Sequence, residues 1–105
     1  MEHILFLTGR LAQPALERVL AGMATGEGAH PFTWETREIG LQVAALMTAD
    51  MIRRRVEPPV VAQRVIVPGR CRGDVEALSE HLGVPVQRGP EELKDLPRFF
   101  QRAAQ

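Results

Sequence analysis

Hydrophobic and polar positions recur with two different periods along the chain. Four short segments, either apolar throughout or alternating, predict strands. The segments 3–7 and 65–67 carry continuous apolar runs, which are typical of central parallel strands buried on both faces. Residues 32–37 alternate apolar and polar side chains, and this period of two predicts a half-exposed edge strand. Residues 84–86 form a fourth strand, which Pro85 places at an edge or at a strand end.

Helical spacing fills the segments between and after these strands. In the first of them, Leu16 and Leu20 recur one helical turn apart, and Pro14 suits the first turn, where its missing N–H costs nothing. Asp74 is a favourable N-cap for the third helix. The last helix is expected to be interrupted or kinked near Pro97. The four predicted helices cover residues 11–23, 41–55, 75–82 and 91–104.

Regular alternation of strands and helices predicts a parallel sheet with helices on both faces. We expect one α/β domain over residues 1–105, a three-layer α/β/α sandwich of the flavodoxin or Rossmann-like kind. Right-handed crossovers leave few topologies. The first and third strands are the most apolar and should be central, so the predicted order of the four strands is 2-1-3-4.

Composition narrows the functional classes. With 45% hydrophobic and 25% charged residues the chain is an ordinary globular one, and its formal net charge of zero gives no support to a broad nucleic-acid or membrane-surface role. The single cysteine, Cys71, excludes an internal disulfide and favours a reducing compartment. Neither a signal peptide nor an apolar span of about 20 residues is recognisable. A cytoplasmic location is therefore expected.

The loops after the first and third strands are the leading candidates for a binding site. In an open parallel sheet, ligands bind where the strand order switches, here between strands one and three. Both loops lead into helix N-termini, which favour anions, and both carry glycines and arginines. A third Gly-Arg loop follows the fourth strand. The predicted anion-binding residues are Thr8, Gly9, Arg10, Gly69, Arg70, Cys71, Arg72, Gly73, Asp74 and Arg88. The alternative is that these are ordinary turn glycines and surface arginines.

Asp50 has two interpretations. On a helical wheel Asp50 falls beside Val43 and Met47, on the apolar face of the second predicted helix, where a carboxylate needs a partner. Arg54, four residues on, is one such partner; in the other interpretation Asp50 and Thr48 reach a loop arginine or a partner domain.

Lys94 is either solvated surface or part of the rim near Arg88. Cys71 lies near a helix N-terminus, which lowers a thiol pKa, but a cysteine-phosphatase loop would need an arginine where this chain has Ala77. No phosphate loop or dinucleotide fingerprint is present. The histidines have no ligand spacing, so neither a metal site nor a cofactor is predicted.

Four stretches together resemble the N-terminal domain of dihydropteroate synthase-related proteins. They are residues 4–12, 43–48, 65–74 and 88–97, and the most specific parts are Pro-Gly-Arg-Cys-Arg-Gly-Asp at 68–74 and Gly-Pro followed by Leu-Lys-Asp-Leu-Pro within 89–97. In that family an α/β domain precedes a pterin-binding barrel. The resemblance implies a role in making tetrahydromethanopterin-type carriers.

The transferase reaction proposed for that family joins a dihydropterin to an arylamine that bears a ribofuranosyl phosphate. The resemblance thus offers a phosphate for the arginine loops. A barrel of about 250 residues does not fit in this chain, so it is not expected to be catalytic alone. The expected partners are a phosphate-bearing small molecule or pterin precursor, and a C-terminal barrel or second subunit. The alternatives are a docking domain without a ligand and an independent small enzyme.

Overall fold

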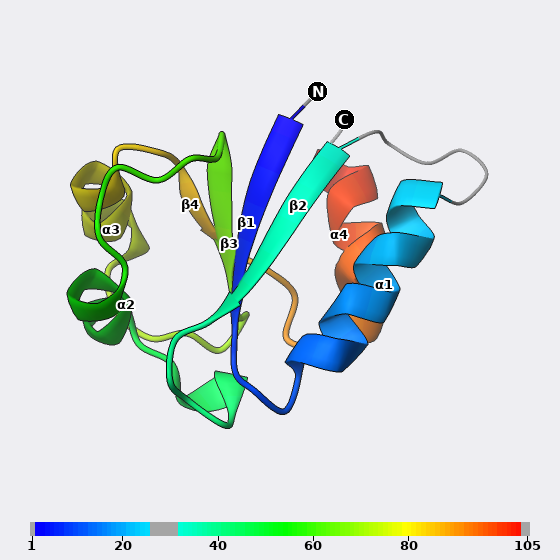
Figure 1. Ribbon diagram of the computed structural model, residues 1–105, viewed down its shortest axis with the longest axis horizontal. Helices are drawn as coiled ribbons and strands as arrows, with labels where there is room; N and C mark the ends of the chain where they lie inside the picture. The colour runs from blue at the N-terminus through cyan, green and yellow to red at the C-terminus, as the bar shows by residue number, and fades with distance from the viewer. Residues whose placement is uncertain (1, 26–31, 104–105) are drawn as a thin grey trace.

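A four-stranded parallel sheet forms the centre of the molecule (Figure 1). The computed structural model describes residues 2–25 and 32–103. Its strand order, β2-β1-β3-β4, is the predicted one. β1 pairs in parallel with β2 along its whole length and with β3 on its other side, and β4 pairs with β3. The strands are β1 (Glu2–Thr8), β2 (Phe32–Glu38), β3 (Arg64–Val67) and β4 (Val86–Arg88).

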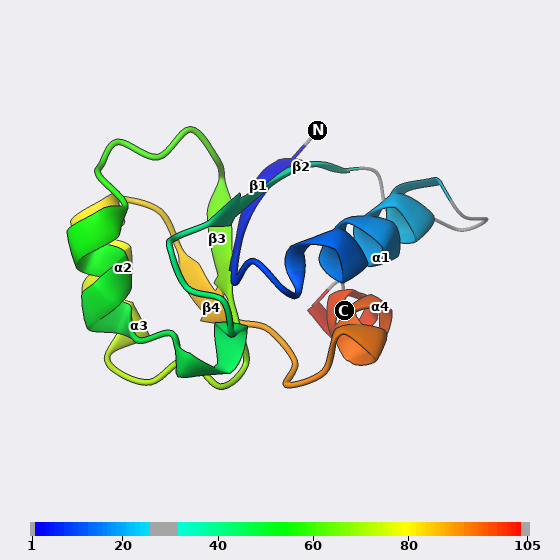
Figure 2. The ribbon, with the colours of Figure 1, turned by 60° about the horizontal axis from the view of Figure 1, so that its bottom comes forward.

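Helices cover both faces of this sheet, as Figures 1 and 2 show. α1 (Gln13–Thr25) and α4 (Leu96–Ala103) lie on one face, and α2 (Ala49–Arg55) and α3 (Val75–Leu82) lie on the other. The predicted α/β fold with helices on both sides is therefore confirmed. Two single 3-10 turns, η1 at Ala44–Leu46 and η2 at Leu93–Asp95, precede α2 and α4.

The sheet separates two apolar clusters, and β1 contributes to both. Leu5 and Leu7 join the cluster under α2 and α3, whereas Ile4 and Phe6 join the cluster under α1 and α4. Successive side chains of a strand point to opposite faces, so a strand covered on both sides has to be apolar throughout. This explains the continuous run that predicted β1 as a central strand.

β2 is an edge strand whose inner face is held to α1 by polar contacts. Glu17 of α1 accepts hydrogen bonds from the hydroxyl of Thr36 and from Nε1 of Trp34, the latter at 3.0 Å. These two bonds stabilise the carboxylate and lower the pKa of Glu17. The alternating pattern of β2 therefore has a physical basis, since one face packs on α1 and the other is exposed.

The helix predicted over residues 41–55 is wrong in its first half. Only one 3-10 turn forms before Thr48, and α2 begins at Ala49. Val43 is 44% exposed and does not belong to an apolar helical stripe. The carbonyls of residues 41 and 42 accept hydrogen bonds from Arg10 and Leu11 of the β1–α1 loop, and these long-range bonds replace helical ones.

Smaller differences occur at the end of the chain. β4 lies two residues later than predicted, because Pro85 comes before the strand and uses only its carbonyl, which accepts a hydrogen bond from Val65. The last predicted helix divides into η2 and α4, and Pro97 lies in the first turn of α4, where its missing N–H is tolerated. Among the described residues, no helix combines the length and the apolar content needed to cross a bilayer.

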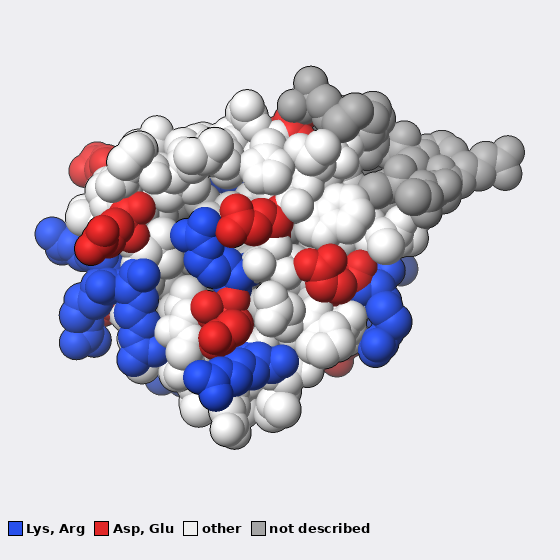
Figure 3. Space-filling view, in the orientation of Figure 1, with Lys and Arg blue, Asp and Glu red and all other residues white. Residues whose placement is uncertain are grey.

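Charges of both signs are interspersed on the face shown in Figure 3. Basic side chains gather over α2, which carries Arg53, Arg54 and Arg55 in its last turn, and acidic residues lie close by. This face therefore does not present the continuous basic surface that nonspecific nucleic-acid binding requires.

Candidate functional site

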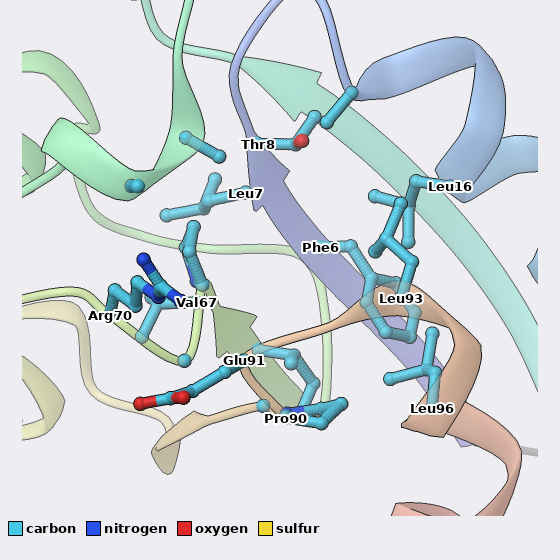
Figure 4. Close-up of a pocket in the computed structure, with 17 residues that line it drawn as sticks. Phe6, Leu7, Thr8, Leu16, Val67, Arg70, Pro90, Glu91, Leu93 and Leu96 are labelled. Atoms are coloured by element: carbon cyan, nitrogen blue, oxygen red, sulfur yellow. The ribbon is translucent and has the colours of Figure 1, made fainter.

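An open cleft of about 220 Å³ lies at the carboxyl ends of β1 and β3 (Figure 4). This is the point at which the strand order switches, and it is where an open parallel sheet binds its ligands. The walls come from the ends of the two strands, from the loops that follow them, and from residues 89–96 beyond β4. The cleft therefore occupies the position that the sequence predicted for the site.

The chemistry of this cleft differs from the prediction, because most of its lining is apolar. Phe6 and Leu16 form one wall with Leu93 and Leu96 of the C-terminal segment, as Figure 4 shows. The polar or charged side chains of the lining are those of Thr8, Arg70 and Glu91. Arg70 is the one member of the predicted arginine set that lines the cleft.

Arg10 is used within the protein. Its Nε lies 3.4 Å from the carboxylate of Glu38, and its side chain is 61% exposed. Its backbone N–H donates to the carbonyl of Leu41 at 2.8 Å. This backbone N–H is thus satisfied by the protein itself.

Gly9 is required for packing and is not part of the cleft lining. A Cβ built on Gly9 would lie 2.7 Å from the amide nitrogen of Ala44 and 2.8 Å from the carbonyl oxygen of Gln42. The close backbone approach that a glycine permits is therefore made to the β2–α2 loop. The neighbouring Thr8 is buried, and its hydroxyl contacts the carbonyl of Gly9 at 3.4 Å.

Arg88 is also used within the protein. Its Nε donates to the carbonyl of Cys71 at 2.8 Å, and its Nη2 donates to the carbonyl of Gly73 at 2.6 Å. Gly73 has a φ of 110°, which favours glycine. Arg88 thus fixes the loop between β3 and α3 and does not line the cleft.

Arg70 and Arg72 lie in the same loop and have different roles. Arg70 is exposed at the edge of the cleft, and its guanidinium makes no hydrogen bond or ion pair with any other residue that the structure describes. Arg72 is exposed outside the cleft, and its backbone links the loop to α2, since its carbonyl accepts from Ala49 at 2.7 Å and its N–H donates to Met47. The arginines predicted to converge at this edge therefore do not do so, and Arg70 is the member of the set that lines the cleft.

Asp50 follows the simpler of its two interpretations. It is exposed and pairs with Arg54 of the same helix at 3.0 Å, so its predicted place on the apolar face is wrong. Thr48 is the N-cap of α2 and accepts a hydrogen bond from Met51. Likewise Lys94 is exposed and pairs with its neighbour Glu92 at 3.2 Å.

Cys71 is buried, with 3% of its surface exposed. Burial raises the pKa of this thiol, although the positive charge of Arg88 opposes the shift. The thiol is therefore protonated at neutral pH and shielded, which disfavours a nucleophilic role. The adjacent Asp74 caps α3 by accepting a hydrogen bond from Ala77, as predicted.

Two parts of the cleft wall contribute lining residues that were not among the predicted site residues. Residues 89–96 follow β4 and fold across the loop after β3: a Cβ on Gly69 would lie 2.6 Å from the carbonyl carbon of Pro90 and 2.7 Å from the amide nitrogen of Glu91. The other missed part, η1, contributes Ala44 and Ala45. The Gly89-Pro90 turn was the signal available in the sequence, since it directs the chain back over the sheet. Within residues 2–25 and 32–103, no cluster of three or more His, Cys, Asp or Glu residues is placed to hold a metal ion.

Comparisons with known proteins identify a family and name no activity. A family model described as a family of unknown function, DUF6513, matches residues 2–91. Neither the curated proteins nor the solved structures include a match to this chain. The matched segment contains all four strands and ends at Glu91, at the edge of the cleft.

Proposed function

We propose a function for this chain, which belongs to DUF6513, a family of unknown function. The proposal is based on the geometry of the cleft. The domain binds a small molecule that has an apolar body and an anionic group. The body enters the cleft between β1 and β3, and the anionic group is held by Arg70 at the edge. The observation that supports this most directly is an unpaired arginine beside an open apolar cleft at the switch point of the sheet.

The size and lining of the cleft support a compact ligand. An apolar protein cavity of about 150 Å³ admits benzene, and the volume here is about 220 Å³. The cleft is therefore large enough for a ring with a substituent, and smaller than the pockets of roughly 300 Å³ or more that hold drug-sized ligands. Contacts with Phe6 and Leu16 would remove the ring from water.

The charge at the edge supports an anionic group. Guanidinium offers paired donors that match phosphate or carboxylate oxygens. Arg70 has no internal partner among the described residues, in contrast to Arg10, which pairs with Glu38, and to Arg88, which donates to two loop carbonyls. An anion at this position would therefore gain hydrogen bonds without breaking any in the protein.

The resemblance to dihydropteroate synthase-related proteins supports a more specific version. In this version the domain belongs to a pterin-handling transferase of tetrahydromethanopterin-type biosynthesis, and Arg70 binds the phosphate of one substrate. The chemistry takes place on a pterin-binding barrel or a second subunit. We place the protein in the cytoplasm, where its single thiol stays reduced.

Titration of the chain with phenyl phosphate, followed by amide NMR, tests the binding function. We expect saturable shifts at the cleft, and a loss of affinity of about ten-fold in Arg70→Ala, since a charge-assisted hydrogen bond is removed. Arg18→Ala removes an exposed arginine of α1 and is the matched control. Arg72→Ala should also bind normally, because Arg72 lies outside the cleft. Absence of saturable shifts at the cleft would overturn the proposal.

A second function, docking without a small ligand, is favoured by a different observation. Three large apolar side chains beside the cleft are exposed: Leu11 by 71%, Val43 by 44% and Leu46 by 65%. They come from the two loops that are joined by the backbone bond from Leu11 to Gln42. In this alternative the exposed side chains contact the barrel or a second subunit. Leu46→Lys would then abolish association in sedimentation experiments and leave phenyl phosphate binding unchanged.

A further inference from the structure

We infer that Glu91 sets a second requirement on the ligand, namely a hydrogen-bond donor placed next to the anionic group. The inference rests on the proposed binding function and makes the ligand class narrower. It predicts a small ring compound that carries an amino or N–H group adjacent to its phosphate or carboxylate. The juxtaposition of Glu91 and Arg70 at one side of the cleft carries the inference.

The backbone brings these two residues together. A Cβ on Gly69 would lie 2.7 Å from the amide nitrogen of Glu91, so the chain around Arg70 directly contacts the chain around Glu91. Both residues line the cleft. In Figure 4 their side chains lie on the same side of it, opposite Leu16 and Leu96.

The two residues lie on adjoining backbone segments, and their charged groups do not pair with one another. No ion pair forms between Arg70 and Glu91, although both are described and pairs within 4.0 Å occur elsewhere on this surface. Glu91 also has no hydrogen-bond donor among the described residues. Each group thus retains its full capacity for a ligand.

A carboxylate beside an anion site discriminates between ligands. An ionised carboxylate only accepts hydrogen bonds, and it repels a second anion. A ligand that presents only a phosphate at this side meets attraction from Arg70 and repulsion from Glu91. A ligand that also presents a donor satisfies both residues. Because the two residues come from adjoining backbone segments, donor and anion must be neighbours on the ligand.

Three probes separate this requirement from simple anion binding: phenyl phosphate, 2-aminophenyl phosphate and 4-aminophenyl phosphate. All three have the ring and the phosphate, and only the 2-amino compound places its donor beside the phosphate. We expect the wild-type chain to bind the 2-amino compound roughly three- to ten-fold more tightly than the other two. The 4-amino compound is the matched control for a general effect of the amino group.

The variant Glu91→Gln completes the test, with Glu92→Gln as its matched control on the adjacent, exposed residue. In Glu91→Gln we expect phenyl phosphate to bind up to about five-fold more tightly, because an exposed like charge is removed, and the preference for the 2-amino compound to shrink. Glu92→Gln should retain the preference.

The outcomes distinguish the two proposals. If phenyl phosphate binds and depends on Arg70 while the 2-amino compound gains nothing, the donor requirement is overturned and the binding function stands. If the 2- and 4-amino compounds gain equally, the requirement is likewise overturned. If none of the three probes binds at the cleft of the wild-type chain, both proposals fail.

Discussion

The guanidinium of Arg88 donates to the carbonyl of Cys71 at 2.8 Å, and this contact joins the end of β4 to the loop that follows β3. A second bond from the same side chain reaches Gly73. The two bonds tie carbonyls of the β3–α3 loop to the end of β4, and each contributes to stability because its donor is charged. Arg88 therefore contributes to the site by fixing its wall.

Arg88→Ala should lower the free energy of unfolding by about 1–2 kcal/mol, because two charge-assisted hydrogen bonds are lost at a partly exposed position. Arg88→Lys should recover only part of this, since an ammonium is a point charge without the planar fork. Urea unfolding measures both. Arg72→Ala, which removes an exposed side chain, should change stability by less than about 0.5 kcal/mol. Equal effects of Arg88→Ala and Arg72→Ala would contradict the assigned role.

Gly69→Ala should lower the free energy of unfolding by about 1–3 kcal/mol and weaken phenyl phosphate binding. The new Cβ would lie 2.6 Å from backbone atoms of Pro90, so the two walls of the cleft would have to separate. Gly22 offers the matched control, because a Cβ there meets nothing within 4 Å and the residue lies within α1. Gly22→Ala should raise stability by about 0.5–1 kcal/mol. Thermal unfolding and the phenyl phosphate titration check both variants.

Cys71 should react slowly with a thiol-specific reagent in the native protein. Its pKa is raised by burial, so less thiolate is present, and the surrounding side chains exclude the reagent. At pH 8 we expect modification to be at least about 100-fold slower than in urea. Reaction at the same rate in both conditions would show that the thiol is accessible.

The same shift in the pKa of Cys71 makes stability depend on pH. The folded state favours the protonated thiol, so the stabilisation is fully present below the unfolded pKa of about 8.5 and is lost as pH rises through the higher folded value. The free energy of unfolding should therefore decline in this alkaline range. Cys71→Ala should lack this component of the decline. An identical pH profile in wild type and Cys71→Ala would exclude the thiol as its source.

Phe100→Ala should lower the free energy of unfolding by about 3–4 kcal/mol, since a buried aromatic side chain is removed. The ring of Phe100 stacks on Phe32 with centroids 5.6 Å apart, and the guanidinium of Arg64 lies 4.9 Å from its centroid. α4 lies beyond the family-matched residues 2–91 but provides Leu96 to the cleft. Urea unfolding and the ligand titration should therefore both be affected. Arg98→Ala, on the exposed side of α4, is the control and should leave both unchanged.

The position of the cleft could be predicted from the sequence, and most of its chemistry could not. Continuous apolar runs identified β1 and β3 as central strands, and the switch between them placed the site. The sequence showed four arginines near that edge, with no indication of which were occupied. Glu38, 28 residues from Arg10, and Cys71, 17 residues from Arg88, are partners that only folding brings into reach.

What the sequence determined by itself was the fold: strand order, edge strands and the N-cap of α3 follow from the face each residue must bury and from hydrogen bonds within one turn. The tertiary structure alone decided that residues 41–43 are not helical, that Arg70 is the arginine left unpaired at the cleft, and that Glu91 lies beside it. The physical reason is the separation along the sequence between the interacting groups. Burial patterns and caps are local and recur at fixed intervals, whereas a hydrogen bond between two loops depends on where distant backbone segments meet.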